Sequence, residues 1–364
     1  MIARFPMHAA RALAIAAVAF GMAGCERPSP VTHQDGYRGT GLVDVQNPRT
    51  VAQKQAANVV PPPLPPAAPG GPPAGTVFKN LQVLQTLSIG DMTRLMAAMT
   101  SWVAPNEGCA YCHNVANMAS DEKYTKVVSR RMLEMTQHIN AEWKPHVAAT
   151  GVTCYTCHRG NPVPSDIWFD HANDVRSTFA GNKGGQNEPT PAVGLTSLPF
   201  DPFSTFLEGD GNIRVVSKTA LPSGDTHSIK QTEWTYGLMM HMSQSLGVNC
   251  TYCHNSRSFT DWDQSTPQRA TAYYGIRMVR DLNKTYLDPL ADVLPPARHG
   301  AAGDGPKLGC ATCHKGVYKP LYGASMLADY SVLAAPPSGP MSSAPTPALP
   351  VDVAPPISAP TGAP

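Results

Sequence analysis

The sequence is poor in lysine-rich runs, in long apolar runs and in aromatic side chains. It contains no lysine-rich run, which argues against nucleic-acid binding. Its N-terminal apolar run covers only residues 12–20, fewer than the roughly 20 residues of a membrane-spanning helix. Aromatic side chains make up 7% of the 364 residues, a modest supply for packing a core. A large, flat apolar ligand could supply the missing core material.

The first 24 residues have the pattern of a secretory signal. Arg4 and Arg11 form the basic part, an apolar run follows, and small residues lead to Cys25. A bacterial lipoprotein signal places its modified cysteine at this point, so we predict lipidation of Cys25 and export. An unpaired thiol at Cys25 and an uncleaved helix as the anchor are the alternatives.

Eight of the nine cysteines fall in four Cys-x-x-Cys-His motifs, at residues 109–113, 154–158, 250–254 and 310–314. This motif is the attachment signature of a c-type haem, in which both sulfurs become thioethers and the histidine binds the iron. Two zinc sites or redox-active dithiols are the alternatives, but neither needs a histidine directly after every second cysteine. The sequence therefore predicts four covalently bound haem c groups, numbered here by motif.

The motifs recur in pairs. Residues 108–114 resemble residues 249–255, and residues 152–160 resemble residues 308–316. We therefore predict a mainly α multihaem cytochrome with two pseudo-repeated dihaem halves, long irregular loops and little β structure. Periodicity and capping residues predict helices over 91–103, 121–143, 228–246 and 266–286, and a short strand near 213–216.

Composition divides the chain further. We expect a signal peptide over 1–24, a lipid-anchored segment with a proline-rich spacer over 25–75, a first dihaem half over 76–165, connecting loops over 166–227, a second dihaem half over 228–330, and a disordered proline- and alanine-rich tail over 331–364.

Each iron needs a sixth ligand if it is to carry electrons without doing chemistry. Methionines on the predicted helices are candidates, although core packing is the common role of such residues. The candidates are Met96 and Met99 for haem 1, Met132 and Met135 for haem 2, Met239, Met240 and Met242 with His241 as a competitor for haem 3, and Met278 with His138 and His146 as alternatives for haem 4.

The stretches 107–113, 130–135, 150–160, 265–270, 275–283 and 319–325 resemble the tetrahaem cytochrome c subunit of the purple-bacterial photosynthetic reaction centre. The motifs have the same order and spacing, and the resemblance covers roughly residues 36 to 330. It also includes residues 201–203 and 219–222, which carry no haem chemistry.

The resemblance implies a full set of haem ligands. It assigns Met278 to packing and gives haem 4 a histidine from the first half of the chain. The implied covalent residues are Cys109, Cys112, Cys154, Cys157, Cys250, Cys253, Cys310 and Cys313, the implied axial ligands are Met96, His113, Met132, His158, Met239, His254, His146 and His314, and the implied lipidation site is Cys25.

The resemblance also implies a function. The chain would be an electron carrier on the periplasmic face of the photosynthetic inner membrane, bound to the L and M subunits, with H and light-harvesting proteins in the wider complex. It would re-reduce the photo-oxidised bacteriochlorophyll pair with electrons from a soluble cytochrome c or high-potential iron–sulfur protein. A reductase of small nitrogen oxides would need an open iron, which the supply of ligands disfavours. A conduit serving another membrane complex is the second alternative.

Overall fold

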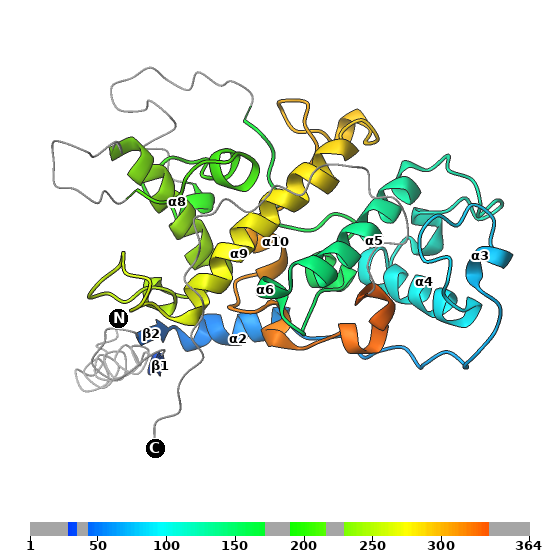
Figure 1. Ribbon diagram of the computed structural model, residues 1–364, viewed down its shortest axis with the longest axis horizontal. Coiled ribbons are helices and arrows are strands. Elements are labelled where there is room, and N and C mark those ends of the chain that lie inside the picture. The colour runs from blue at the N-terminus through cyan, green and yellow to red at the C-terminus, as the bar shows by residue number, and fades with distance from the viewer. Residues whose placement is uncertain (1–27, 35–42, 172–189, 216–228, 335–364) are drawn as a thin grey trace, which may run out of the picture.

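The computed structural model describes residues 28–34, 43–171, 190–215 and 229–334. Helix predominates in these ranges, which confirms the predicted mainly α fold (Figure 1). The α-helices are α2 (Pro48–Ala57), α3 (Ala74–Val77), α4 (Ile89–Val103), α5 (Tyr124–Glu142), α6 (Lys144–Val147), α7 (Cys154–His158), α8 (Ile229–Leu246), α9 (Pro267–Leu282) and α10 (Cys310–His314). Strands β1 (Val31–Gln34) and β2 (Val43–Gln46) pair antiparallel.

Short helical turns join these helices. The 3₁₀ turns are Gly108–Tyr111, Pro191–Val193, Cys250–Tyr252, Asp288–Leu290, Pro296–Arg298, Pro320–Gly323 and Leu327–Ala334, and the π turns are Ser204–Glu208 and Asn283–Leu287. The four predicted helices correspond to α4, α5, α8 and α9. The last of these continues beyond Leu282 through the π turn.

Local sequence explains where the predicted helices begin. The Ser88 hydroxyl accepts a hydrogen bond from the Asp91 N–H and so caps α4. Helix α9 starts with Pro267 in its first turn, where the missing N–H costs nothing. Capping and apolar periodicity together were therefore enough to predict these two helices.

Two features of the fold differ from the expectation. The predicted strand is wrong over residues 213–215, which form no strand, and residue 216 lies outside the described ranges. The apolar side chain of Ile213 packs on a core and its carbonyl accepts a hydrogen bond from Thr235, so no strand partner is needed. Conversely, the polar N-terminal segment forms β1, β2 and α2 without any sustained apolar period.

Two apolar cores share helix α5. The α9 core gathers Met135, Leu238, Ile276 and Leu282, among others. The α4 core gathers other side chains, among them Leu95, Trp102, Leu133, Tyr330 and Leu333. The C-terminal turn Leu327–Ala334 therefore packs back on the first half of the chain, beside α4 (Figure 1).

The proline-rich stretch 61–73 lies against α4. The Leu64 carbonyl accepts a hydrogen bond from Arg94 Nη2 at 2.8 Å, and its N–H donates to the Tyr330 hydroxyl at 3.1 Å. Polyproline segments cannot satisfy their own carbonyls, so these side chains hold the stretch in place. The signal peptide and Cys25 lie outside the described residues. Among the helices that are described, none is long and apolar enough to cross a membrane.

Candidate haem sites

The four motifs adopt two local structures. Motifs 1 and 3 begin as single 3₁₀ turns, whereas motifs 2 and 4 are the short helices α7 and α10. In each helical motif the residue just before the first cysteine donates its backbone N–H to the threonine hydroxyl inside the motif. Thr153 donates to Thr156 and Gly309 donates to Thr312, at 3.0 Å each. Both helices then end on a left-handed residue, Arg159 and Lys315 respectively. Motifs that pair in sequence therefore also pair in conformation.

The four motif histidines share one hydrogen-bonding arrangement. In each ring Nδ1 lies within hydrogen-bonding distance of a backbone carbonyl. A carbonyl can only accept, so Nδ1 carries the proton and Nε2 keeps its lone pair for a metal. The pairs are His113 with Met118 at 3.3 Å, His158 with Asn161 at 2.9 Å, His254 with Phe259 at 2.9 Å and His314 with Val317 at 3.0 Å.

Electrostatics also suit metal binding. Burial lowers the pKa of all four motif histidines, and for His314 it lowers the pKa to about 4. A metal binds the neutral imidazole, so a ring that resists protonation is a better ligand near neutral pH. The residues present therefore fit the group that the motifs predict.

His146 stands opposite the motif histidine of haem 4. Its ring centroid is 6.1 Å from that of His314. Metal–imidazole bonds are about 2 Å long, so two imidazoles on opposite sides of one ion place their centroids roughly 6 Å apart. His146 Nδ1 is bonded to the Thr271 carbonyl at 2.9 Å, which again leaves Nε2 for the metal. Burial lowers the pKa of His146 as well.

The other two candidates for haem 4 have structural roles. His138 Nε2 is 2.7 Å from Asp281 Oδ2, which also accepts from Trp143 Nε1 at 2.9 Å, so this ring joins α5 to α9. Met278 is 8% exposed and belongs to the α9 core. This arrangement favours His146 over both.

The methionines assigned to haems 1–3 are less buried than their neighbours in the cores. Met96, Met132 and Met239 are half-buried and pack at the edges of the two cores, whereas Met135 is fully buried. A half-buried thioether on a core edge is available to a ligand bound there. These three assignments stay predictions.

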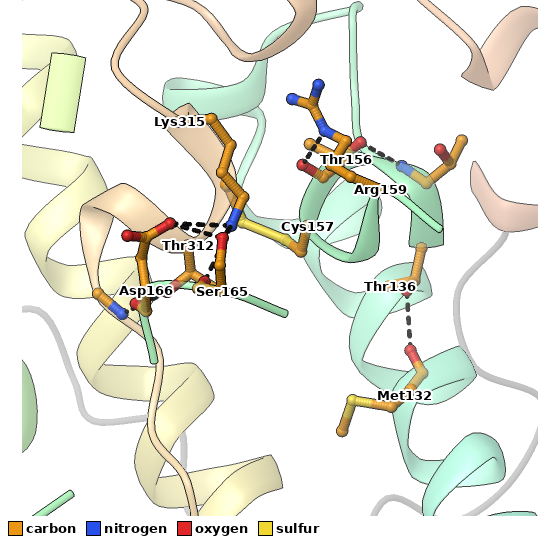
Figure 2. The surroundings of a disulfide bond; sticks show 12 residues. Met132, Thr136, Thr156, Cys157, Arg159, Ser165, Asp166, Thr312 and Lys315 are labelled. Carbon is orange, nitrogen blue, oxygen red and sulfur yellow. Dashed lines mark hydrogen bonds and ion pairs between the residues drawn. A yellow bond between two sulfur atoms is a disulfide. The ribbon is translucent and has the colours of Figure 1, made fainter. Parts of the chain in front are cut away.

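Motifs 2 and 4 lie directly against each other. Cys157 and Cys313 are joined by a disulfide, with their Cα atoms 4.4 Å apart (Figure 2). Helix α5 passes beside this junction, and Thr136 donates to the Met132 carbonyl there at 2.8 Å. A sulfur forms either the disulfide or the predicted thioether, so covalent haem binding by Cys157 and Cys313 is a prediction for the chain in which this disulfide is not formed.

The zinc alternative gains no support from the geometry. A structural zinc site needs four converging ligands. All four motifs lie within the described ranges, and in those ranges no group of three or more histidine, cysteine or acidic side chains could hold a metal ion.

Sequence reasoning missed the side chains that hold the motif segments. Asn249 Nδ2 and Thr251 Oγ1 both donate to the Val43 carbonyl, at 2.9 and 2.8 Å, which ties β2 to motif 3. Asn140 and Asn283 fasten the segments before motifs 2 and 4 in a similar way. Only hydrogen bonds between residues far apart in sequence reveal these roles.

Comparison with known proteins identifies the family. The family model described as "Photosynthetic reaction centre cytochrome C subunit" matches residues 26–334. This chain belongs to that family. It is 56% identical over 325 residues to the photosynthetic reaction center cytochrome c subunit of Rubrivivax gelatinosus (strain NBRC 100245 / IL144), covering 89% of this chain and 88% of that one. It is 52% identical over 312 residues to the subunit of Thermochromatium tepidum, covering 84% and 76%.

Family membership confirms several predictions. The chain is an electron carrier and not an enzyme, which removes the nitrogen-oxide reductase from consideration. It is a c-type cytochrome with covalently bound haem, and it acts in photosynthetic electron transport in association with the reaction centre and hence the photosynthetic membrane. A more distant relative, at 27% identity over 305 residues and with 66% of this chain and 69% of that one covered, is cytochrome c-554 of Chloroflexus aurantiacus.

Proposed function

We propose that this chain carries four haem c groups that pass electrons from a soluble periplasmic donor to the photo-oxidised bacteriochlorophyll pair. The observation that carries the proposal is that motifs 2 and 4 contact each other and also contact α4 and α8, the helices that carry the proposed ligands of haems 1 and 3. The Gly160 N–H, two residues after motif 2, donates to the Trp102 carbonyl of α4 at 2.7 Å, and the Gly316 N–H, two residues after motif 4, donates to the Ser245 carbonyl of α8 at 2.8 Å. Helices α7 and α10, which are motifs 2 and 4, also pack against each other.

These contacts support the order 1, 2, 4, 3 for the proposed sites. Helix α4 carries the proposed haem 1 ligand and α8 carries that of haem 3, and the two helices lie on opposite sides of α10 (Figure 1). A bound haem supplies an iron that takes up and releases one electron. The chain's part is to hold four such groups in one row, so that each site adjoins the next.

The two kinds of axial ligand have different effects. A methionine thioether raises the potential of a haem and a second histidine lowers it. With Met96, Met132, Met239 and His146 as the sixth ligands, three sites have higher potentials and haem 4 has a lower one. The row therefore combines strong and weak electron acceptors.

Charge and anchoring support the proposed partners. The formal net charge is +2, and removal of the leader takes away two arginines and no acid. Eight haem propionates then bring the holoprotein to roughly −8, which steers a basic soluble donor toward it. The donor would be a small cytochrome c or a high-potential iron–sulfur protein, and the membrane partners would be the L and M subunits, with H and light-harvesting proteins around them. Diacylglycerol on Cys25 would hold the chain at the periplasmic face, since each buried CH₂ contributes about 0.8 kcal/mol.

A flash experiment tests the proposed function. Deleting the chain from photosynthetic membranes is expected to remove the rapid re-reduction of the oxidised pair, together with the transient haem oxidation that accompanies it. Restoring the wild-type chain should restore both signals. An unchanged rate of re-reduction in the deletion strain would instead assign the chain to a different membrane complex.

A methionine pair tests the ligand of haem 2. Met132→Ala is expected to lower the midpoint potential of one haem and leave the other three, because it removes one thioether. Met135→Ala is the matched control: it is expected to leave all four midpoints and to destabilise the fold by about 2–5 kcal/mol, because Met135 is buried in the α9 core. A redox titration of each purified variant gives the answer. Four unchanged midpoints in Met132→Ala would reject the assignment.

A further inference from the structure

Helices α5 and α9 hold their motifs in the same register. Asn140 Oδ1 accepts from the Val152 N–H at 2.8 Å and its Nδ2 donates to the Val152 carbonyl at 2.9 Å. Asn283 makes the same pair of bonds to Leu308, at 2.8 and 3.1 Å. Val152 and Leu308 each stand two residues before the first cysteine of their motif. The two asparagines are therefore equivalent anchors, from which positions along the two helices can be compared.

At the same distance before the two asparagines, α5 has a methionine and α9 has a glycine. Eight residues before Asn140 is Met132, the proposed ligand of haem 2, and eight residues before Asn283 is Gly275. Met132 to Asn140 lies within α5, and Gly275 to Leu282 lies within α9, with Asn283 in helical conformation as the next residue. The two positions therefore lie on the same face relative to their motifs. Where haem 2 has the thioether of Met132, haem 4 therefore has Gly275, which carries no side chain.

The space at Gly275 is filled by the imidazole of His146. A Cβ atom on Gly275 would lie 2.5 Å from His146 Cε1 and 2.8 Å from Nδ1, closer than such atoms can approach. One turn earlier in α9, the Thr271 carbonyl accepts the proton of His146 Nδ1 at 2.9 Å. The ring thus lies over the glycine of α9, and its centroid is 6.1 Å from that of His314.

We propose that Gly275 determines which ligand haem 4 takes. Its missing side chain removes the thioether that this position would otherwise present, and it opens the space through which a histidine from the first half reaches the site. Gly275 is a positioning residue that acts through His146, so this inference rests on the proposed ligation by His146.

Alanine at this position is the first test. Gly275→Ala is expected to displace His146, so that one of the four haems loses its low-spin spectrum, binds carbon monoxide and shifts its midpoint upward. Gly237→Ala is the matched control, because Gly237 is also a buried glycine inside a helix, and its Cβ would make ordinary contact with Val193 at 3.4 Å. Four wild-type midpoints and no carbon monoxide binding in Gly275→Ala would overturn the inference.

Methionine at this position is the second test, and it guards against simple misfolding. His146→Ala alone is expected to open haem 4, and adding Gly275→Met should close it again with a thioether, giving a low-spin haem with a midpoint above the wild-type value. Carbon monoxide binding by the double variant as strong as by His146→Ala would overturn the proposed equivalence with Met132.

The variants also separate this inference from the proposed ligation. If His146→Ala leaves all four haems unchanged, the ligand assignment fails and the inference fails with it. If His146→Ala opens haem 4 while Gly275→Ala changes nothing, only the role of Gly275 is overturned. Visible spectra and redox titrations of the purified haem-loaded variants decide between these results.

Discussion

Replacing Lys307 by methionine is expected to lower the free energy of unfolding by about 3–5 kcal/mol near pH 8. The residue is only 2% exposed, and its Nζ is 2.6 Å from Asp304 Oδ2 and 3.0 Å from Asp170 Oδ2. Methionine is similar in volume but brings no charge. The change would leave two carboxylates without their counter-charge in a poorly solvated site, and that loss sets the size of the effect.

The loss should depend on pH. Burial raises the pKa of Glu208, the ammonium group of Lys307 opposes this, and the negative charge of Asp170 adds to it, so that the pKa is about 7. Asp288, in the same group, has a raised pKa for similar reasons. A carboxyl with a raised pKa holds a proton in the folded chain that it has lost in the unfolded chain. Its contribution to stability therefore falls as the pH rises from 4.5 to about 7.

This sign predicts that Lys307→Met is tolerated better near pH 5 than near pH 8, because the carboxyls around it can then take up protons. Burial lowers the pKa of Lys307, but the hydrogen bonds that its ammonium group donates to Asp304 and Asp170 outweigh this, so the pKa is raised. Its own stabilisation is therefore complete at both pH values.

Urea unfolding of the haem-loaded protein at the two pH values measures the effect. Lys284→Met is the control: Lys284 is also paired with a carboxylate, Asp210, at 3.2 Å, but the two side chains are 46% and 82% exposed. An exposed pair of this kind contributes at most about 1 kcal/mol. Equal losses in the two variants, or an equal loss at both pH values for Lys307→Met, would contradict the prediction.

The Lys307 cluster also bears on the haem 4 segment. The backbone N–H and carbonyl of Lys307 pair with those of Trp168, at 2.8 and 3.1 Å, and Trp168 Nε1 donates to the Leu308 carbonyl at 2.7 Å. The residues just before motif 4 are therefore held by the same network that buries the ammonium group. When the Lys307 cluster is destabilised, we expect motif 4 to lose its structure before other parts of the chain.

Local patterns in the sequence predicted the features of the molecule that depend on residues close together in the chain. The motifs, the caps and the apolar periodicity identified the haem chemistry and the four long helices, since each of these signals lies within one or two helical turns. Gly275 also left a local signal, because a glycine inside a predicted helix costs roughly 0.5–1 kcal/mol and marks a close approach. The sequence offered no means of identifying His146 as the group that approaches.

The remaining features depend on contacts between distant residues. Asn140 bonds a residue 12 positions away and Asn283 bonds one 25 positions away, so no fixed spacing reveals that they are equivalent. The dipeptide Arg131-Met132 recurs as Arg277-Met278, and this local match is what makes Met278 a candidate ligand of haem 4. Met278 is three residues from Gly275, the position that the hydrogen bonds make equivalent to Met132. The N-terminal strands were missed for a similar reason, because Val43 is held by Asn249 and Thr251.

Replacing His146 by alanine is expected to remove the sixth ligand of one haem completely. That haem should become high-spin, bind carbon monoxide and rise in midpoint potential, while the other three keep their spectra. The fold should survive, because Trp143, just before α6, and Val147, the last residue of α6, still pack on the α9 core. The visible spectrum with and without carbon monoxide, at each step of a redox titration, records the change.

His138→Ala is the control that separates a ligand from a structural histidine. Its loss deprives Asp281 of one hydrogen bond while Trp143 Nε1 and Thr285 Oγ1 remain bonded to that carboxylate, at 2.9 and 3.0 Å. We expect a destabilisation of about 1–3 kcal/mol with all four haem spectra intact. Carbon monoxide binding to His138→Ala and not to His146→Ala would move the haem 4 ligand to α5. The 6.1 Å spacing of His146 and His314 would then be a packing contact, and the haem 4 site would have to open on the side of Asp281.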